Sequence, residues 1–205
     1  MTDFSTSLSQ ALALLIQVDS DLWEIVALSF QVSLSAVMIA SLIGLPLGVL
    51  LATKKFRGQG LIHILVDTLM ALPPVVVGLF VYLLLSRAGP FGVFGLLYTP
   101  TAMIIAQSVL ITPIIVALSL QVFTPLWAHL GEQLQLFNTS PMQRFLCLLR
   151  EGRHQLVTVW LAGFGRAIAE IGAVMMVGGN IDHYTRVMTT SIALETSKGN
   201  LEMAM

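Results

Sequence analysis

Charged residues are scarce in this sequence of 205 residues. Asp, Glu, Lys and Arg together make up 10% of the chain, whereas hydrophobic residues make up 56%. Soluble domains contain about 25% charged residues, which help to cover the surface that faces water. The mean hydropathy of +0.87 points the same way. The shortage of charge therefore excludes an ordinary soluble domain and predicts a membrane protein.

Cysteine and clustered metal ligands are missing too. Cys147 is the only cysteine, which excludes an intrachain disulfide and a thiol pair for a metal or for redox chemistry. The 4 histidines are scattered and none has the HExxH spacing of zinc hydrolases. The formal net charge is −1, which gives no support to a nucleic-acid-binding face. We therefore expect no metal site and no nucleic-acid partner.

Catalytic motifs are also missing. The sequence has no GxxxxGK[ST] phosphate-binding loop and no constellation of a nucleophilic Ser or Cys with a base. We expect no catalytic residue and no cofactor in this chain, which cannot bind and hydrolyse ATP by itself. Any energy must come from a partner or from a gradient.

Long hydrophobic runs dominate what is present. A bilayer core about 30 Å thick requires roughly 20 apolar residues per helix. Four runs of this kind lie at residues 25–52, 61–86, 98–123 and 156–181. The second and third are joined by a short Gly- and Pro-containing turn at 88–97. The pattern predicts an all-α, polytopic transmembrane domain that begins at residue 25 and extends to residue 205.

The distribution of Lys and Arg predicts the orientation of these spans. Positive charge collects in short cytoplasmic loops. It collects here after the first span and in the segment 124–155, at Lys54, Lys55, Arg57, Arg144, Arg150 and Arg153. Residues 1–24 contain acidic residues and no basic one, so we expect an external N-terminal segment. Its apolar part, 8–18, is too short to cross and is typical of an amphipathic surface helix.

Two places inside the spans carry unusual residues. Pro73 and Pro74, followed by Gly78, predict a break in the second span, which either lines a pathway or is a packing kink. In the fourth span, Arg166 and Glu170 have i, i+4 spacing on one helix face. Because charges in a membrane are costly, that face must turn inward. The two side chains either form a structural ion pair or help an anion or a gate, and glycines at 163, 165 and 172 indicate close packing there.

The segment 124–155 is long for a connection between spans. Apolar residues recur in it at helical spacing on both sides of a polar stretch at 138–141. This pattern predicts two short amphipathic helices around a turn. Such a pair can bury its apolar stripe against the membrane domain or against a cytosolic partner, and a chain without an ATPase of its own favours the partner.

Three stretches resemble a known family. They are MALPPVVVGLFVYLLLSRAGPFG at 70–92, AGFGRAIAEIGAVMMVGGNI at 162–181 and TRVMTTSIALETSKG at 185–199. The chain resembles the membrane permease subunit of type I ABC importers, in the tungstate, molybdate and sulfate branch and most closely the tungstate permeases. The resemblance runs from about the first span to the end of the chain.

The resemblance also implies roles for particular residues. The segment 124–155 corresponds to the EAA loop, which transmits closure of the ATPase. Its residues would be Glu132, Phe137, Asn138, Arg150 and Glu151. The sequence departs from the family pattern, since Asn138 replaces a glycine and Arg150-Glu151 replaces Leu-Pro. The translocation path or gate would be formed by Pro73, Pro74, Gly78, Arg166, Glu170, Thr189 and Thr190.

The resemblance implies an ATP-driven importer of an oxyanion, tungstate above all, that works by alternating access. The expected partners are a second copy of the permease, a dimer of cytosolic ABC ATPases that bind the ATP, an external oxyanion-binding protein and the lipid of a bacterial or archaeal cytoplasmic membrane. The N-terminus would lie outside. Similar permeases continue with a further transmembrane helix, so this helix is either absent here or follows residue 205.

Alternative functions are a permease for molybdate, vanadate or sulfate, a gradient-driven transporter without ATPases, and a structural scaffold. A gradient-driven transporter needs inverted repeats or acidic proton relays, and the spans contain only Asp67 and Glu170 as acidic residues. A scaffold leaves the Pro-Pro break and the long inside segment unexplained.

Overall fold

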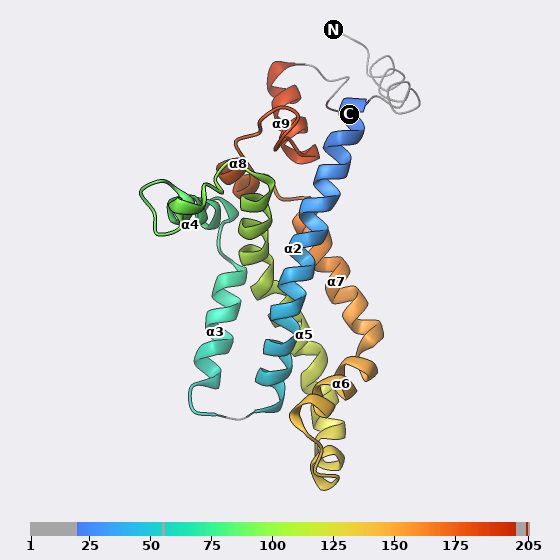
Figure 1. Cartoon of the computed structure of the whole chain (residues 1–205). Helices are drawn as coiled ribbons and strands as arrows, with labels where there is room; N and C mark the ends of the chain where they lie inside the picture. The colour runs from blue at the N-terminus through green and yellow to red at the C-terminus, as the bar shows by residue number, and fades with distance from the viewer. Residues whose placement is uncertain (1–19, 55, 200–203, 205) are drawn as a thin grey trace. The chain divides into compact units, whose positions relative to one another are not determined.

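The computed structural model describes residues 20–54, 56–199 and 204, and every regular element in this part of the chain is helical. The helices are α2 (Ser20–Thr53), α3 (Gln59–Met70), α4 (Pro74–Leu85), the short 3₁₀ helix η1 (Gly92–Phe94), α5 (Pro100–Leu136), α6 (Pro141–Glu151), α7 (Arg153–Ile168), α8 (Gly172–Gly178) and α9 (Met188–Lys198). All of them except η1 are labelled in Figure 1. The all-α fold class is confirmed. Most of the predicted external segment, 1–19, lies outside the described residues.

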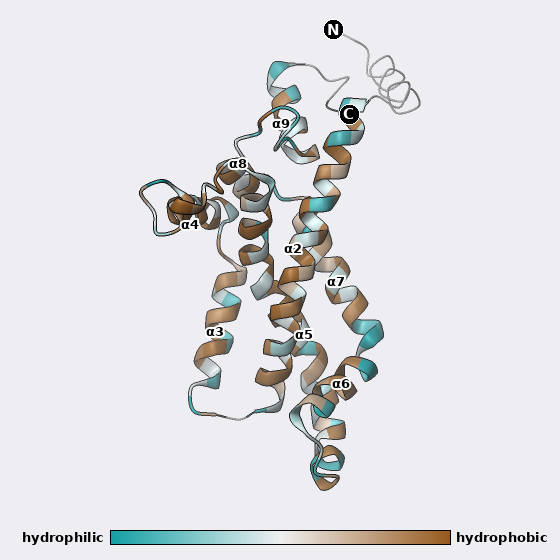
Figure 2. Ribbon diagram, viewed as in Figure 1, coloured by the Kyte–Doolittle hydropathy of each residue, from teal (hydrophilic) through white to brown (hydrophobic). Residues whose placement is uncertain are grey.

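Two helices are long and apolar enough to cross a bilayer alone. They are α2, with 34 residues, and α5, with 37 residues. Two further candidates are bent pairs: α3 and α4 meet at 96°, and α7 and α8 meet at 56°. Apolar residues prevail along most of these helices (Figure 2). The described residues therefore provide two spans, or up to four if each bent pair crosses as one, and the four crossings stay a prediction.

The structure corrects two expected boundaries. The third span and the first amphipathic helix of the inside segment form one helix, α5, which continues through Pro125 to Leu136. The helix holds because residues on both sides of this proline, Phe123 and Trp127, pack in one apolar cluster with Leu148 of α6. The fourth span is not one helix either, since α7 ends at Ile168 and α8 begins at Gly172.

The described residues divide into two compact units. The first contains residues 20–34, 74–106, 168–199 and 204, and the second contains residues 35–54, 56–73 and 107–167. The boundaries fall inside α2 and α5, at the α3–α4 break and at the end of α7. Each unit has an apolar core of its own.

The core of the first unit forms around α4 and α8. Its buried side chains come from α2, α4, α5 and α8 and include Val32, Val81, Leu85, Met103, Val174 and Val177. The two short helices approach closely because Gly78 has no side chain: a Cβ atom there would lie 2.7 Å from Ala173 Cα. Gly172 faces Val75 in the same way, also at 2.7 Å.

The second unit is held together by small residues against α5. A Cβ atom on Gly44 of α2 would lie 2.8 Å from Ile115 Cγ2, and one on Gly163 of α7 would lie 2.7 Å from Ile115 Cδ1. Gly48 lies directly against Ser119. Close packing at Gly163 and Gly172 agrees with the sequence, whereas the expectation for Gly165 is wrong, since a Cβ atom there would meet nothing within 4 Å.

Replacement of Gly78 with alanine should destabilise the first unit. The added Cβ meets backbone atoms of Ala173, which cannot rotate away, and overpacking of this kind costs about 1–3 kcal/mol. We expect G78A to lower the thermal unfolding midpoint of the purified protein by several degrees. The matched control is G165A, also within a helix, where the open space and the better helix propensity of alanine leave the midpoint unchanged or raise it. Equal midpoints for the two variants would contradict the close α4–α8 contact.

Candidate functional site

The predicted break at Pro73-Pro74 is confirmed. Helix α3 ends at Met70, and Pro74 is the first residue of α4. Proline is well suited to that position, because its missing N–H would have no helical partner there and its fixed φ fits the first turn. The backbone N–H of Ala71 closes the end of α3 by donating to the carbonyls of Asp67 and Thr68, at 3.2 and 3.1 Å.

Glu170 organises the second break. Its side chain is buried, with 3% of its surface exposed. Its Oε1 accepts a hydrogen bond of 3.0 Å from the backbone N–H of Ala173, in the first turn of α8. Its own carbonyl accepts a bond of 2.9 Å from Thr189 Oγ1 on α9. The residue thus satisfies a helix N-terminus and joins it to the next helix.

The α7–α8 break corrects the prediction that Arg166 and Glu170 lie on one helix. The i, i+4 spacing assumed one continuous helix, but α7 ends at Ile168, so Glu170 lies beyond it. Arg166 occupies the last turn of α7, where a cation is favoured by the helix dipole. The prediction that Arg166 and Glu170 share one helix face is therefore wrong. An interaction between their side chains stays a prediction.

The two threonines of the predicted path make backbone hydrogen bonds. Thr189 donates to Glu170, as described above. Thr190 is fully buried, and its Oγ1 accepts from the N–H of Val187 at 3.1 Å and donates to the carbonyl of the same residue at 3.0 Å. These bonds hold the beginning of α9, so both hydroxyl groups position helices in the first unit.

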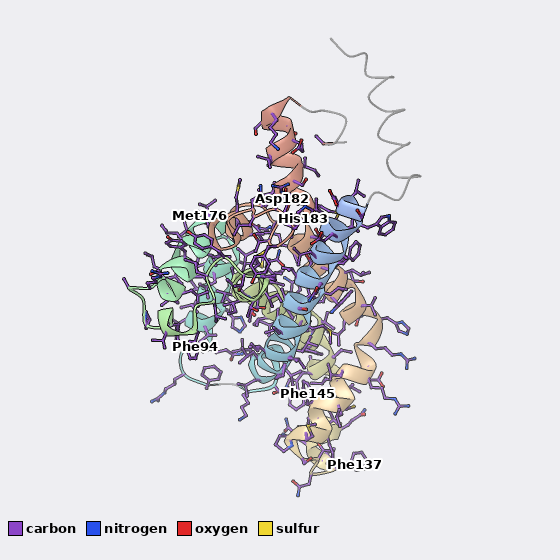
Figure 3. All side chains as sticks on the ribbon, turned by 45° about the horizontal axis from the view of Figure 1, so that its top comes forward. Phe94, Phe137, Phe145, Met176, Asp182 and His183 are labelled. Carbon is purple, nitrogen blue, oxygen red and sulfur yellow. The ribbon has the colours of Figure 1, made fainter. Side chains whose placement is uncertain are left out.

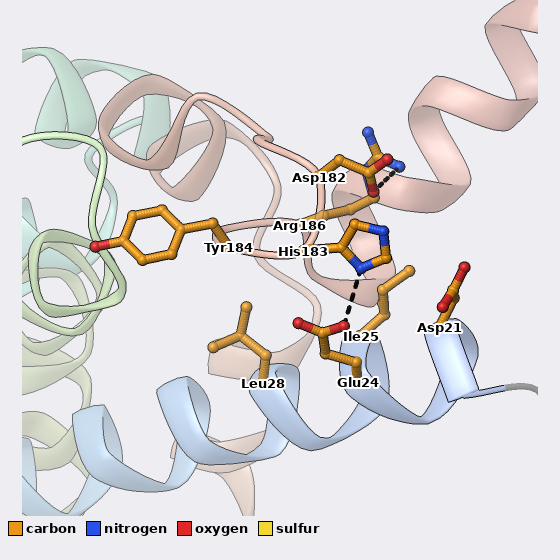
Figure 4. A pocket seen from close by; sticks show the side chains of 8 residues that line it. All are labelled: Asp21, Glu24, Ile25, Leu28, Asp182, His183, Tyr184 and Arg186. Atoms are coloured by element: carbon orange, nitrogen blue, oxygen red, sulfur yellow. Dashed lines mark hydrogen bonds and ion pairs between the residues drawn. The ribbon is translucent and has the colours of Figure 1, made fainter.

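A polar cluster that sequence reasoning missed links α2 to the loop before α9 (Figure 4). His183 Nδ1 and Glu24 Oε2 are 3.0 Å apart, and Arg186 pairs with Asp182 at 2.6 Å. Deeper along α2, Ser29 Oγ accepts from the N–H of Met188 at 2.8 Å. A serine inside an apolar run was the available signal, but its partner is 159 positions away.

In the second unit, α5 and α6 form a helical hairpin around Asn138. Asn138 has φ 49°, a left-handed conformation that asparagine tolerates and glycine adopts most easily. Helix α6 begins with a capping box, because Ser140 Oγ accepts from Gln143 N–H and Gln143 Oε1 accepts from Ser140 N–H, at 3.3 and 2.8 Å. Pro141 fits the first position of the helix.

The outer end of this hairpin, residues 132–140, is called the hairpin tip below. Leu136 and Phe137 expose 85% and 80% of their surface. Figure 3 shows Phe137 at the end of the hairpin, beyond Phe145. Glu132 and Asn138 are also exposed. Exposed apolar side chains of this size indicate a surface that a partner or lipid covers.

The structure separates the predicted coupling residues into two groups. Glu132, Phe137 and Asn138 lie at the hairpin tip. Arg150 and Glu151 lie at the opposite end of α6, which has 11 residues and is therefore about 16 Å long. The role of all five residues in coupling stays a prediction.

A cavity of about 590 Å³ lies between α5 and α7 in the second unit. Its lining is mostly apolar but includes four polar, uncharged or weakly basic side chains, those of Gln121, His129, Gln155 and Thr158. No carboxylate lines it. The α5–α7 cavity can therefore offer hydrogen-bond donors without repelling an anion.

These features define the class of protein. Helices suited to a membrane are interrupted at two places, and a helical hairpin carries exposed apolar residues, as expected of the membrane subunit of a transporter. The chain belongs to the family described as "Binding-protein-dependent transport system inner membrane component", whose model matches residues 44–203. Members are multi-pass transport subunits of the inner membrane, and ATP hydrolysis belongs to a separate ATPase. A substrate-binding protein and generally a dimeric permease complete such systems.

Three relatives are similar over most of the chain. A probable anion ABC transporter permease protein of Haloferax volcanii is 40% identical over 87% of this chain and 79% of the relative. The tungstate uptake system permease protein TupB of Peptoclostridium acidaminophilum is 40% identical over 95% and 86%. The TupB of Campylobacter jejuni is 40% identical over 71% and 61%. The resemblance to tungstate-type permeases is confirmed.

The His183–Glu24 contact should make stability depend on pH. The hydrogen bond to Glu24, with the negative charges of Asp182, Glu24 and Asp21, raises the pKa of His183 above its usual value of about 6.5. The contact therefore contributes fully below about pH 6.5 and is lost as the pH rises through the raised pKa. We expect the wild-type unfolding midpoint to fall across this range more than that of H183Q. The control H154Q, on α7, should follow the wild type, and parallel curves for all three proteins would contradict the effect.

Proposed function

We propose that the chain is the permease subunit of an ATP-driven importer of tungstate. The observation that carries this proposal is the 40% identity to a tungstate uptake permease over 95% of the chain. A second tungstate permease and a probable anion permease at the same identity support it. Molybdate, vanadate and sulfate are the competing substrates.

The hairpin tip is the contact for the cytosolic ATPase. A pair of ATPases docks on two copies of the permease, and each tip enters one of them. The exposed Leu136 and Phe137 support this role, and so does Glu132 on the last turns of α5. The left-handed conformation of Asn138 also fits, because the family has a glycine at that position. Arg150 and Glu151 lie at the far end of α6, outside the contact with the ATPase, and contribute to coupling through the helix α6.

The translocation path is formed at the two helix breaks. Pro73, Pro74 and Gly78 allow one break, and Glu170, Thr189 and Thr190 hold the other. Arg166 supplies positive charge near the path. The α5–α7 cavity, considered by itself in the second unit, offers neutral hydrogen-bond donors, which bind a dianion weakly. Weak binding suits a passage, so selectivity resides in the external binding protein.

The orientation follows the basic residues. Lys54, Arg57 and the hairpin face the cytoplasm, where short loops retain positive charge. The N-terminus and the loop with His183 then face outward. This surface is where the external binding protein delivers the anion. The transmembrane domain extends from residue 25 to residue 205, with the coupling segment at 124–155.

The anion can be identified from cellular metal content. Cells with and without this gene are grown with trace tungstate and molybdate, and intracellular tungsten and molybdenum are measured by mass spectrometry. We expect tungsten alone to fall without the gene and to return with a plasmid copy. Loss of molybdenum instead would assign the permease to the other oxyanion, and loss of neither would contradict oxyanion import of this kind.

Reversal of charge at the hairpin tip should uncouple the transporter. We expect E132R to reduce tungsten uptake by about tenfold or more and to weaken co-purification of the ATPase, since misplaced charge at an interface costs a few kcal/mol. The permease dimer should remain intact by size-exclusion chromatography.

The matched control is H154R, which adds positive charge on an exposed face of α7 away from the tip. Uptake and ATPase retention should then match the wild type. If E132R behaves as H154R does, the hairpin tip is not the coupling contact.

A further inference from the structure

A groove of about 440 Å³ lies where the end of α2 meets the beginning of α6, within the second unit. Pro46, Val49, Leu50, Thr53, Lys54, Pro141, Met142, Arg144 and Phe145 line it. The hairpin tip and the translocation path proposed above do not include its lining residues, although four of these residues, on α6, belong to the coupling segment 124–155. It is distinct from the hairpin tip, since none of its lining residues belongs to 132–140.

The lining combines two kinds of chemistry. Six of the nine residues are apolar, and they come from both helices. Lys54 and Arg144 are the charged members, and no carboxylate is among them. Thr53 satisfies its own hydroxyl by donating to the carbonyl of Val49 at 2.8 Å. The groove therefore offers an apolar channel together with two uncompensated positive charges.

The two cations are available to a ligand. Arg144 is half-buried, and its Nε–H donates to Thr139 Oγ1 at 3.2 Å, which fixes the guanidinium. The described residues give its two Nη groups no acceptor. Lys54 is exposed and has no carboxylate partner within the described part of the chain. A fixed guanidinium beside an ammonium group suits a phosphate.

The charge pattern of α2 points to a groove at the depth of lipid headgroups. No charged residue occurs between Glu24 and Lys54, so the apolar part of α2 ends at this lysine. A cation directly after a membrane helix lies at the interface between hydrocarbon and water. Helix α6 is fixed beside it, because Leu148 is fully buried against Val49 and Phe123.

We propose that this groove binds one anionic phospholipid of the membrane leaflet. The phosphate is held between Lys54 and Arg144, and an acyl chain lies along the apolar side chains of α2 and α6. Basic pockets beside membrane helices bind anionic headgroups in this way. A free inorganic anion would use the cations but not the six apolar residues. The site does not depend on which substrate the permease carries.

The proposal can be tested by native mass spectrometry of the purified full-length permease, alone and with its ATPase. The probes are dioleoyl phosphatidylglycerol and dioleoyl phosphatidylcholine, which have the same acyl chains. The test variant K54Q/R144Q removes both cations of the groove. The matched control R57Q/R153Q removes two exposed cations outside it. The single variant K54Q, at an exposed position after α2, serves if the double variant does not fold.

We expect the wild type to retain phosphatidylglycerol in preference to phosphatidylcholine, and K54Q/R144Q to reduce this preference by about tenfold. The control R57Q/R153Q should keep the preference for phosphatidylglycerol. Inorganic phosphate at 10 mM, about a hundredfold excess over the lipid, should not displace the lipid. Equal binding of the two lipids, or an unchanged preference in the test variant, would overturn the proposal. Displacement by phosphate would indicate a site for a free anion, and loss of the lipid on addition of the ATPase would show that the ATPase occupies the groove.

Discussion

The need to satisfy backbone hydrogen bonds in an apolar environment governs this structure. A helix that stops inside hydrocarbon leaves N–H and C=O groups without water to bind them. At the α7–α8 break, the carboxylate of Glu170 accepts the N–H of Ala173, and its carbonyl accepts Thr189 Oγ1. Gly78 lets α4 and α8 pack directly against each other in the same region. The first unit is thus built around the ends of its short helices.

The α3–α4 break can be predicted from the sequence more readily than the α7–α8 break. Pro73 and Pro74 are adjacent and both lack backbone N–H groups, so two consecutive helical hydrogen bonds are lost and an interruption is expected, whereas the single Pro125 lies within α5. No proline marks the α7–α8 break, and the spacing of Arg166 and Glu170 suggested a continuous helix. The α7–α8 break is stabilised by the hydrogen bond from the Ala173 N–H to the Glu170 carboxylate, which forms only in the folded chain. For the same reason the partners of Ser29 and His183, each 159 positions away, could not be predicted.

The segment 124–155 was also predicted only in part from the sequence. Its apolar spacing predicted helices around a turn, and α6 with its Ser140 capping box is such a helix. The other half is the end of α5, because packing of Phe123 and Trp127 continues the helix through Pro125. Local signals thus placed the turn and the second helix, whereas a tertiary cluster decided how far α5 extends. Arg150 is separated from the hairpin tip by the length of α6.

The exposed hairpin tip has a consequence for the life of the subunit in the cell. Before assembly with an ATPase, Leu136 and Phe137 are exposed, and chaperones and proteases recognise exposed apolar side chains. A permease made in excess of its ATPase would therefore be held by chaperones or degraded, while an assembled one would be protected. The two side chains that we propose for the ATPase contact would then keep the subunits of the transporter in matching amounts.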